Sequence, residues 1–157
     1  MESEQRRLRL DQDRLRSQLA GAAGTPLHGK TALSSKKVLD FLYGTLKLPP
    51  QFAGRGARKR PTANEVAIRR LILNKATAAR MAEVGPLILA DRRTQKLLEF
   101  TDPARLDPDG RFRCTYAFTT DTGRLSSREN PKGTGANTQN IDREVRCVFV
   151  PDQWVDA

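Results

Sequence analysis

The sequence contains very little cysteine, histidine and tryptophan. Of its 157 residues, two are cysteine, one is histidine and one is tryptophan. Cys114 and Cys147 are too few and too isolated for a zinc site or a disulfide framework, so we expect two half-buried thiols in a reducing compartment, the cytoplasm. A single histidine, His28, cannot form a metal site without help from elsewhere, and we interpret it as a loop residue.

Long hydrophobic runs are also missing. No stretch approaches the roughly 20 apolar residues that a membrane-spanning helix needs. The charged residues throughout positions 1–20 argue against a signal peptide. Hydrophobic residues make up 38% and aromatic residues 6% of the chain, which allows only a modest core. We therefore expect no membrane partner.

Basic residues are abundant. The chain has 28 Lys and Arg against 18 Asp and Glu, which gives a formal net charge of +10. Such a balance favours a polyanionic partner, of which nucleic acid is the commonest. An anionic membrane surface is the rival polyanion, but it is not the partner that we expect.

The first part of the sequence predicts helices. Leu8, Leu15 and Leu19 follow one another at spacings of seven and four, which predicts a helix over 4–20. Ser34 or Ser35 can cap a second helix, which Pro49-Pro50 ends. Its expected buried residues are Val38, Leu39, Leu42 and Leu46.

Two more helical segments follow a basic loop over 51–61. Thr62 and Glu65 form a capping-box pattern, which predicts a helix from about 63 to 74 with more helix beyond it. Gly85-Pro86 breaks this run and can begin the next helix, which we expect to reach about Phe100.

The pattern then changes to that of strands. After a turn at Asp109-Gly110, apolar and polar residues alternate over 111–118, and they alternate again at Val145, Cys147 and Phe149. The sequence therefore predicts an α+β fold, with a helical region over 1–108 and a β-containing region over 109–157.

A polar stretch over 121–146 lies between these two strand patterns. It combines arginine, amides and hydroxyls, which can donate to phosphate oxygens and to the acceptors of the minor groove. Composition alone favours an ordinary solvated loop. The order of the residues favours something more specific: Thr-Gly-Arg-Leu-Ser-Ser over 122–127, Asn-Thr-Gln-Asn-Ile over 137–141, and then Phe-Val-Pro over 149–151.

This order closely resembles the family A DNA polymerases of the bacterial and phage type. Weaker similarity upstream, in 34–49, 60–66 and 109–112, extends the resemblance over nearly all of 20–157. It implies the end of the thumb followed by an antiparallel β segment at the start of the palm. The sequence departs from the family pattern at Thr138, where leucine is usual, at Asp142, where proline is usual, and in an inserted segment over 132–136.

The resemblance also implies which residues contact DNA. Arg124 would contact the minor groove near the primer terminus, and Gln139 and Asn140 would contact the duplex close by. The remaining expected DNA contacts, through sugar and phosphate, are Ser126, Ser127, Asn137 and, more weakly, Arg143.

By the same resemblance, the chain is part of a DNA-directed DNA polymerase that uses deoxynucleoside triphosphates and Mg²⁺ in a bacterial or phage-infected cell. The chain ends before the expected metal-binding aspartates. Asp156 follows Phe149 more closely than we expect for the first of them, although Asp-Ala occurs at that motif in some phage enzymes. We therefore assign it no catalytic or metal-binding residue, and expect it to need the remainder of the polymerase for synthesis.

Two alternatives remain. A stand-alone basic nucleic-acid-binding module would have the same charge. A P-loop nucleoside triphosphatase would fit the literal pattern of 24–31, with Leu87–Asp91 as its second motif. The physical context disfavours the P-loop, because a charged helix and not a buried strand precedes it, and because Pro26 removes an N–H donor.

Overall fold

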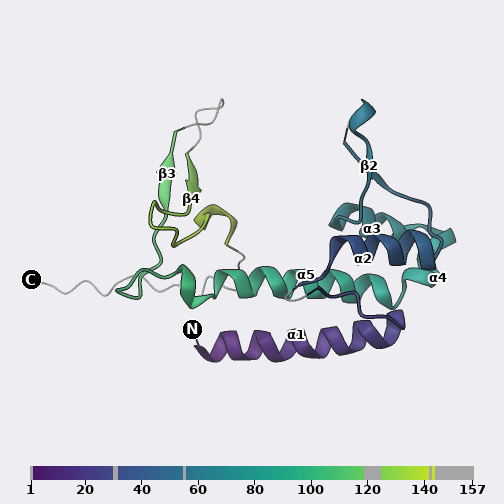
Figure 1. Ribbon diagram of the computed structural model, residues 1–157, viewed down its shortest axis with the longest axis horizontal. Coiled ribbons are helices and arrows are strands. Elements are labelled where there is room, and N and C mark those ends of the chain that lie inside the picture. Colours follow the sequence, from purple (N-terminus) through teal and green to yellow (C-terminus); the bar gives the residue numbers. More distant parts are fainter. Residues whose placement is uncertain (1, 30–31, 55, 119–124, 142, 144–157) are drawn as a thin grey trace, which may run out of the picture. The chain divides into compact units, whose positions relative to one another are not determined.

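The computed structural model describes residues 2–29, 32–54, 56–118, 125–141 and 143 (Figure 1). These residues form helices and two small antiparallel two-stranded sheets, so the fold class is α+β, as expected. The chain divides into two compact units, Met1–Arg9 with Lys96–Ala157, and Leu10–Gln95. The division between 1–108 and 109–157 stays a prediction.

Helix α1, Glu2–Ala23, contributes to both units. It includes the whole helix predicted over 4–20. Leu8 is buried in one unit and Leu19 in the other, whereas Leu15 is only half-buried. The leucine spacing thus correctly indicated the buried side of this helix.

The second unit, Leu10–Gln95, continues with α2, Ser35–Leu39, which runs directly into a π-helix, Asp40–Thr45. Ser34 caps α2, as predicted, by accepting a hydrogen bond from the N–H of Lys37. In the π-helix the N–H of Leu46 donates to the carbonyl of Phe41, five residues earlier, at 2.9 Å. Val38, Phe41 and Leu42 are buried, whereas Leu39 and Leu46 are half-buried.

Helix α3, Glu65–Leu73, begins later than the capping box predicts. The chain stays extended through Asn64, whose carboxamide accepts the N–H of Ala67 at 2.9 Å, so Asn64 and not Thr62 is the cap. Thr62 instead accepts the N–H of Asn64. The expected partner of the capping box, Glu65, binds Arg69 one turn later.

Helix α4, Lys75–Met81, and most of α5, Val84–Phe100, complete the helical part of this unit; residues 96–100 of α5 belong to the other unit. The break between them falls at 82–83, just before the predicted Gly85-Pro86, and Pro86 occupies the first turn of α5. Gly85 allows a close approach, because a Cβ there would lie 2.8 Å from Cγ1 of Ile72. Figure 1 shows α2 and α3 beside α5. The core between these helices consists of Leu19, Leu27, Val38, Phe41, Leu42, Leu48, Ala63, Ile68, Leu71, Met81, Val84 and Ile88.

A short hairpin precedes α3. Its strands are β1, Phe52–Ala53, and β2, Arg60–Pro61, with a 3₁₀ turn at Gly56–Arg58 between them. The predicted basic loop over 51–61 therefore contains an antiparallel hairpin.

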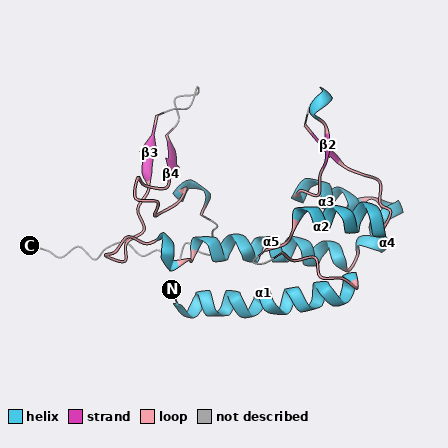
Figure 2. Ribbon diagram, viewed as in Figure 1, coloured by secondary structure: helices cyan, strands magenta, loops and turns pink. Residues whose placement is uncertain are grey.

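The first unit contains the second sheet, drawn in magenta in Figure 2. Strand β3, Thr115–Ala117, pairs antiparallel with β4, Ser126–Arg128, in the register Thr115↔Arg128 and Ala117↔Ser126. Two 3₁₀ turns, Pro103–Arg105 and Thr138–Asn140, flank this sheet in sequence. Leu8 and Leu97 form a small core of this unit.

Strand β3 is shorter than the alternation over 111–118 predicts. Residues 111–114 make other contacts: the carbonyl of Arg111 accepts the N–H of Asp107 at 2.9 Å, and Gly135 packs against the carbonyl of Arg113. The partner strand comes from within the polar stretch. The strand expected at 145–149 lies outside the described residues.

In the part of the chain that the structure describes, no helix has the length and apolar character needed to cross a bilayer.

Candidate nucleic-acid interface

Several of the residues expected to contact DNA lie close together beside β4. Ser126 and Ser127 belong to β4, Asn137 caps the next 3₁₀ turn, and Gln139 lies within that turn. Hydrogen bonds between the strand and the turn hold the group together.

The other expected contacts are less fully defined. The main chain of Asn140 ends the 3₁₀ turn, and Arg143 is exposed. Arg124 lies outside the described residues. The contacts of all seven residues with DNA stay predictions.

Ser127 and Asn137 connect the strand to the turn. Ser127 is 4% exposed, and its hydroxyl donates to Oδ1 of Asn137 at 2.7 Å. The N–H of Gln139 donates to the same Oδ1 at 3.0 Å. Ser127 thus uses its hydroxyl inside the protein, which makes it a support for Asn137 in this structure.

Gln139 is anchored from the opposite side. Its exposed side chain donates through Nε2 to the carbonyl of Leu125 at 2.8 Å, which connects the turn to the residue preceding β4. Ser126 has a weaker bond, from its hydroxyl to the carbonyl of Ala117 at 3.4 Å.

Sequence reasoning missed two residues of this cluster. The hydroxyl of Thr138 lies 3.4 Å from Sγ of Cys114 and 3.3 Å from Oγ of Ser127. Cys114 is half-buried, as expected. The one signal in the sequence was the departure from the family pattern at Thr138, where a hydroxyl replaces a hydrocarbon.

Asp107 binds side chains of the segment that precedes the 3₁₀ turn at Thr138–Asn140. Its carboxylate accepts hydrogen bonds from Nη1 of Arg113 at 2.6 Å, from Nδ2 of Asn130 at 3.1 Å, and from the hydroxyl of Thr134. The Thr134 hydroxyl, followed by Arg113, holds the pKa of Asp107 below its ordinary value. Asp107 therefore fixes part of the inserted segment over 132–136.

Arg113 also binds Asp109. Its two terminal nitrogens donate to the two carboxylate oxygens at 2.8 and 2.5 Å. This bidentate hydrogen bonding lowers the pKa of Asp109 from 3.8 to about 2 and raises that of Arg113. The guanidinium of Arg113 is therefore bound by the carboxylates of Asp107 and Asp109, which balance its positive charge.

A second basic surface lies on the β1–β2 hairpin of the other unit. Arg58, Lys59 and Arg60 are all exposed there, and Phe52 is 55% exposed. Exposed cations beside an exposed aromatic ring are typical of surfaces that bind nucleic acid.

His28 lies in the loop before α2, as expected, but has a structural partner that the sequence did not indicate. Its Nε2 lies 3.0 Å from Oδ1 of Asp91 on α5. Asp91 is completely buried, and its Oδ2 has no hydrogen bond among the described residues. The pair fastens the loop to the helix.

The region of the P-loop pattern has the context that disfavours a nucleoside triphosphatase. Helix α1, and not a strand, precedes Gly24, and Leu87–Asp91 lies within α5. Lys30 and Thr31 lie outside the described residues.

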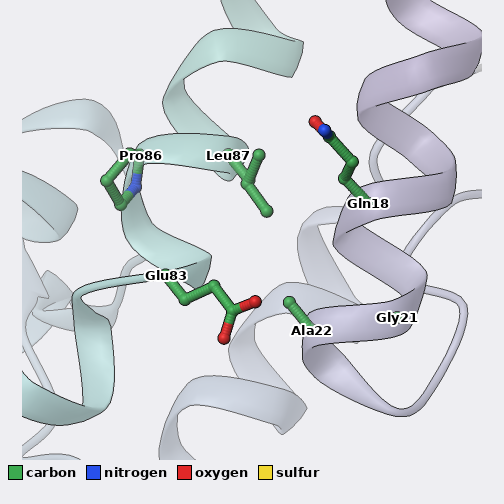
Figure 3. A pocket seen from close by; sticks show the side chains of 6 residues that line it. All are labelled: Gln18, Gly21, Ala22, Glu83, Pro86 and Leu87. Atoms are coloured by element: carbon green, nitrogen blue, oxygen red, sulfur yellow. The ribbon is translucent and has the colours of Figure 1, made fainter.

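An open groove of about 450 Å³ lies between the end of α1 and the beginning of α5 (Figure 3). Gln18, Gly21 and Ala22 line one side, and Glu83, Pro86 and Leu87 line the other. None of the predicted site residues lines it.

Among the described residues, no three or more histidine, cysteine, aspartate or glutamate side chains are grouped so that they could hold a metal ion. Asp156 lies outside these residues.

Comparison with known proteins adds no further information: no protein-family model matches the chain, and no curated protein matches it either.

Proposed function

We propose that this chain is part of a family A DNA-directed DNA polymerase and that it grips the primer–template duplex through the surface formed by β4 and the 3₁₀ turn at Thr138–Asn140. The order of the motif residues over 122–127 and 137–141 carries the proposal. Support comes from the hydrogen bonds that bring Ser127, Asn137 and Gln139 into one cluster.

The chemistry of this cluster suits a duplex whatever its sequence. Amide N–H groups can donate to phosphate oxygens and to the N3 and O2 acceptors, which A·T and T·A pairs present alike. The exposed guanidinium of Arg143 can neutralise a phosphate. Such a surface senses the duplex and not its base order.

The complete polymerase would use deoxynucleoside triphosphates and Mg²⁺ in the cytoplasm. The described residues contain no carboxylate set that fits Mg²⁺. The role proposed for the described residues is duplex binding.

The test is a fluorescence-anisotropy titration of the full chain with a labelled primer–template duplex at low salt. Gln139→Ala should raise Kd about fivefold, the effect of losing one hydrogen bond. Gln18→Ala serves as the matched control, because Gln18 is also an exposed glutamine and lies on α1. Equal affinity of wild type and Gln139→Ala would contradict the proposed surface.

A stand-alone basic binding module is the second candidate, and the exposed hairpin residues Arg58, Lys59 and Arg60 favour it. Their combined replacement by alanine is its test. If this variant loses duplex affinity while Gln139→Ala binds like wild type, the basic module is the better account.

A further inference from the structure

We propose that Thr138 and Cys114 are positioning residues for nucleic-acid binding. With Ser127 they form a hydrogen-bond chain that turns the NH₂ group of Asn137 outward, towards an acceptor on the duplex. This inference rests on the proposed function, because it assigns the role of Asn137 within the same surface.

The direction of the hydrogen bonds follows from one group that can only donate. The main-chain N–H of Gln139 lies 3.0 Å from the carboxamide of Asn137, so the atom facing it must be the oxygen Oδ1. This settles the orientation of the carboxamide, which is otherwise ambiguous between oxygen and nitrogen.

The remaining protons then have only one arrangement. The hydroxyl of Ser127, 2.7 Å from Oδ1, must donate to it. The Ser127 oxygen is then an acceptor, from the hydroxyl of Thr138 at 3.3 Å and from the main-chain N–H of Gln139 at 3.4 Å. Because the Thr138 proton is used in that bond, the thiol of Cys114 must donate to the Thr138 oxygen, at 3.4 Å.

The consequence for Asn137 is a fixed set of donors. Its Oδ1 accepts two hydrogen bonds, which uses both lone pairs. Its NH₂ group makes no hydrogen bond that involves another described residue, so two donors are available. They match the acceptors of a duplex, which are phosphate oxygens and the minor-groove N3 and O2 atoms.

A purely structural role is the competing explanation, since the same chain also connects β3, β4 and the turn. The two explanations differ in their dependence on Asn137. If Thr138 acts through Asn137, its replacement costs affinity only when Asn137 is present, which a double-mutant cycle measures.

The experiment uses the full chain and the same labelled duplex. Thr138→Val removes the hydroxyl and keeps the shape, and should raise Kd about 3- to 10-fold, the range for one hydrogen bond. Thr138→Ser and Cys114→Ser keep a donor and should bind like wild type. In an Asn137→Ala background, Thr138→Val should have no further effect. An equal loss in both backgrounds, or no loss in either, would overturn the proposal.

A second measurement does not depend on duplex binding. In the protein without DNA, the side-chain NH₂ resonances of Asn137 in ¹⁵N NMR spectra should shift in Thr138→Val and stay in place in Thr138→Ser. Unchanged resonances in both variants would refute the positioning role. If wild type binds no duplex while the resonances shift as expected, the proposed function fails and the orientation of Asn137 stands.

Discussion

Gly135 occupies a position where no side chain fits. Its φ is 77°, its N–H donates to the carbonyl of Arg105 at 2.7 Å, and a Cβ would lie 1.7 Å from the carbonyl oxygen of Arg113. Gly133 has nearly the same φ, 78°, but open space around it. A side chain at Gly133 would therefore suffer backbone strain alone, whereas one at Gly135 would suffer both backbone strain and steric overlap.

We expect Gly135→Ala to destabilise the β3–β4 unit by about 2–4 kcal/mol, because strain and overlap add. Gly133→Ala should cost only about 1 kcal/mol, from the left-handed backbone alone. Hydrogen exchange of the β3 and β4 amides measures both. Similar protection in the two variants would show that Arg113 can move aside.

Asp109 makes the stability of this unit sensitive to acid. Its pKa in the folded chain is about 2, below the ordinary 3.8, mainly because Arg113 donates to it. The unfolded chain therefore binds a proton more readily than the folded chain does. The stabilisation is fully present above pH 3.8 and is lost as the pH falls towards 2.

In urea titrations from about pH 5 down to about pH 1.5, the free energy of unfolding should fall across this window. NMR resonances of β3 and β4 report it. Asp109→Asn should weaken the dependence but not abolish it, because the pKa of Asp107 is lowered as well. An unaltered pH profile in Asp109→Asn would contradict the assignment.

At the scale of the elements, the loop before α2 is joined to α5 by one side-chain pair. Oδ1 of the buried Asp91 on α5 has His28 as its partner, and Oδ2 has none within the described residues. His28→Ala should therefore destabilise the helical unit by about 3–5 kcal/mol, the cost of breaking a buried pair by removing one partner.

His28→Gln is the matched control, because its amide keeps an N–H donor near Asp91. Urea denaturation followed by far-ultraviolet circular dichroism compares the variants. Equal stability of His28→Ala and wild type would mean that water replaces the imidazole without cost.

The helices could be predicted because their signals are local. The leucine spacing of α1 and the Ser34 cap of α2 depend on neighbouring residues only, and both predictions are confirmed. The predicted start of α3 was wrong. Thr62 and Asn64 can both cap a helix, and only the conformation of the chain decides between them. The predicted length of β3 was also wrong, because Gly135, which is distant in sequence, packs against Arg113.

The candidate site was predicted only in part, because some of its contacts join residues that are distant in sequence. The motif order indicated Ser127, Asn137 and Gln139, which the structure brings together. The contribution of Cys114 could not be predicted, because its contact with Thr138 spans 24 positions and depends on the register of β3 with β4.

For the molecule as a whole, the net charge of +10 should make duplex binding steeply dependent on salt. Each neutralised phosphate contributes about −0.9 to the slope of log K against log salt. Arg143→Ala should reduce the steepness by about 0.9, whereas Gln139→Ala should lower the affinity and leave the slope unchanged.

Arg14→Ala is the charge-matched control, because Arg14 is an exposed arginine on α1. Anisotropy titrations over a salt series measure these slopes; an effect of Arg14→Ala as large as that of Arg143→Ala would indicate diffuse charge attraction.

The π-helix at Asp40–Thr45 bears on how relatives of this chain can differ in length. A π-turn accommodates one residue more than an α-turn between the same hydrogen-bonded neighbours, as the bond from Leu46 to Phe41 shows. Deleting one residue here would convert the turn to ordinary α-helix and leave Val38 facing the core. The same deletion inside α3 would rotate the rest of that helix by about 100° and expose Ile68 or Leu71. We therefore expect the loss of a single residue to be tolerated better in this segment than inside α3, and an alignment of related chains should place its gap here.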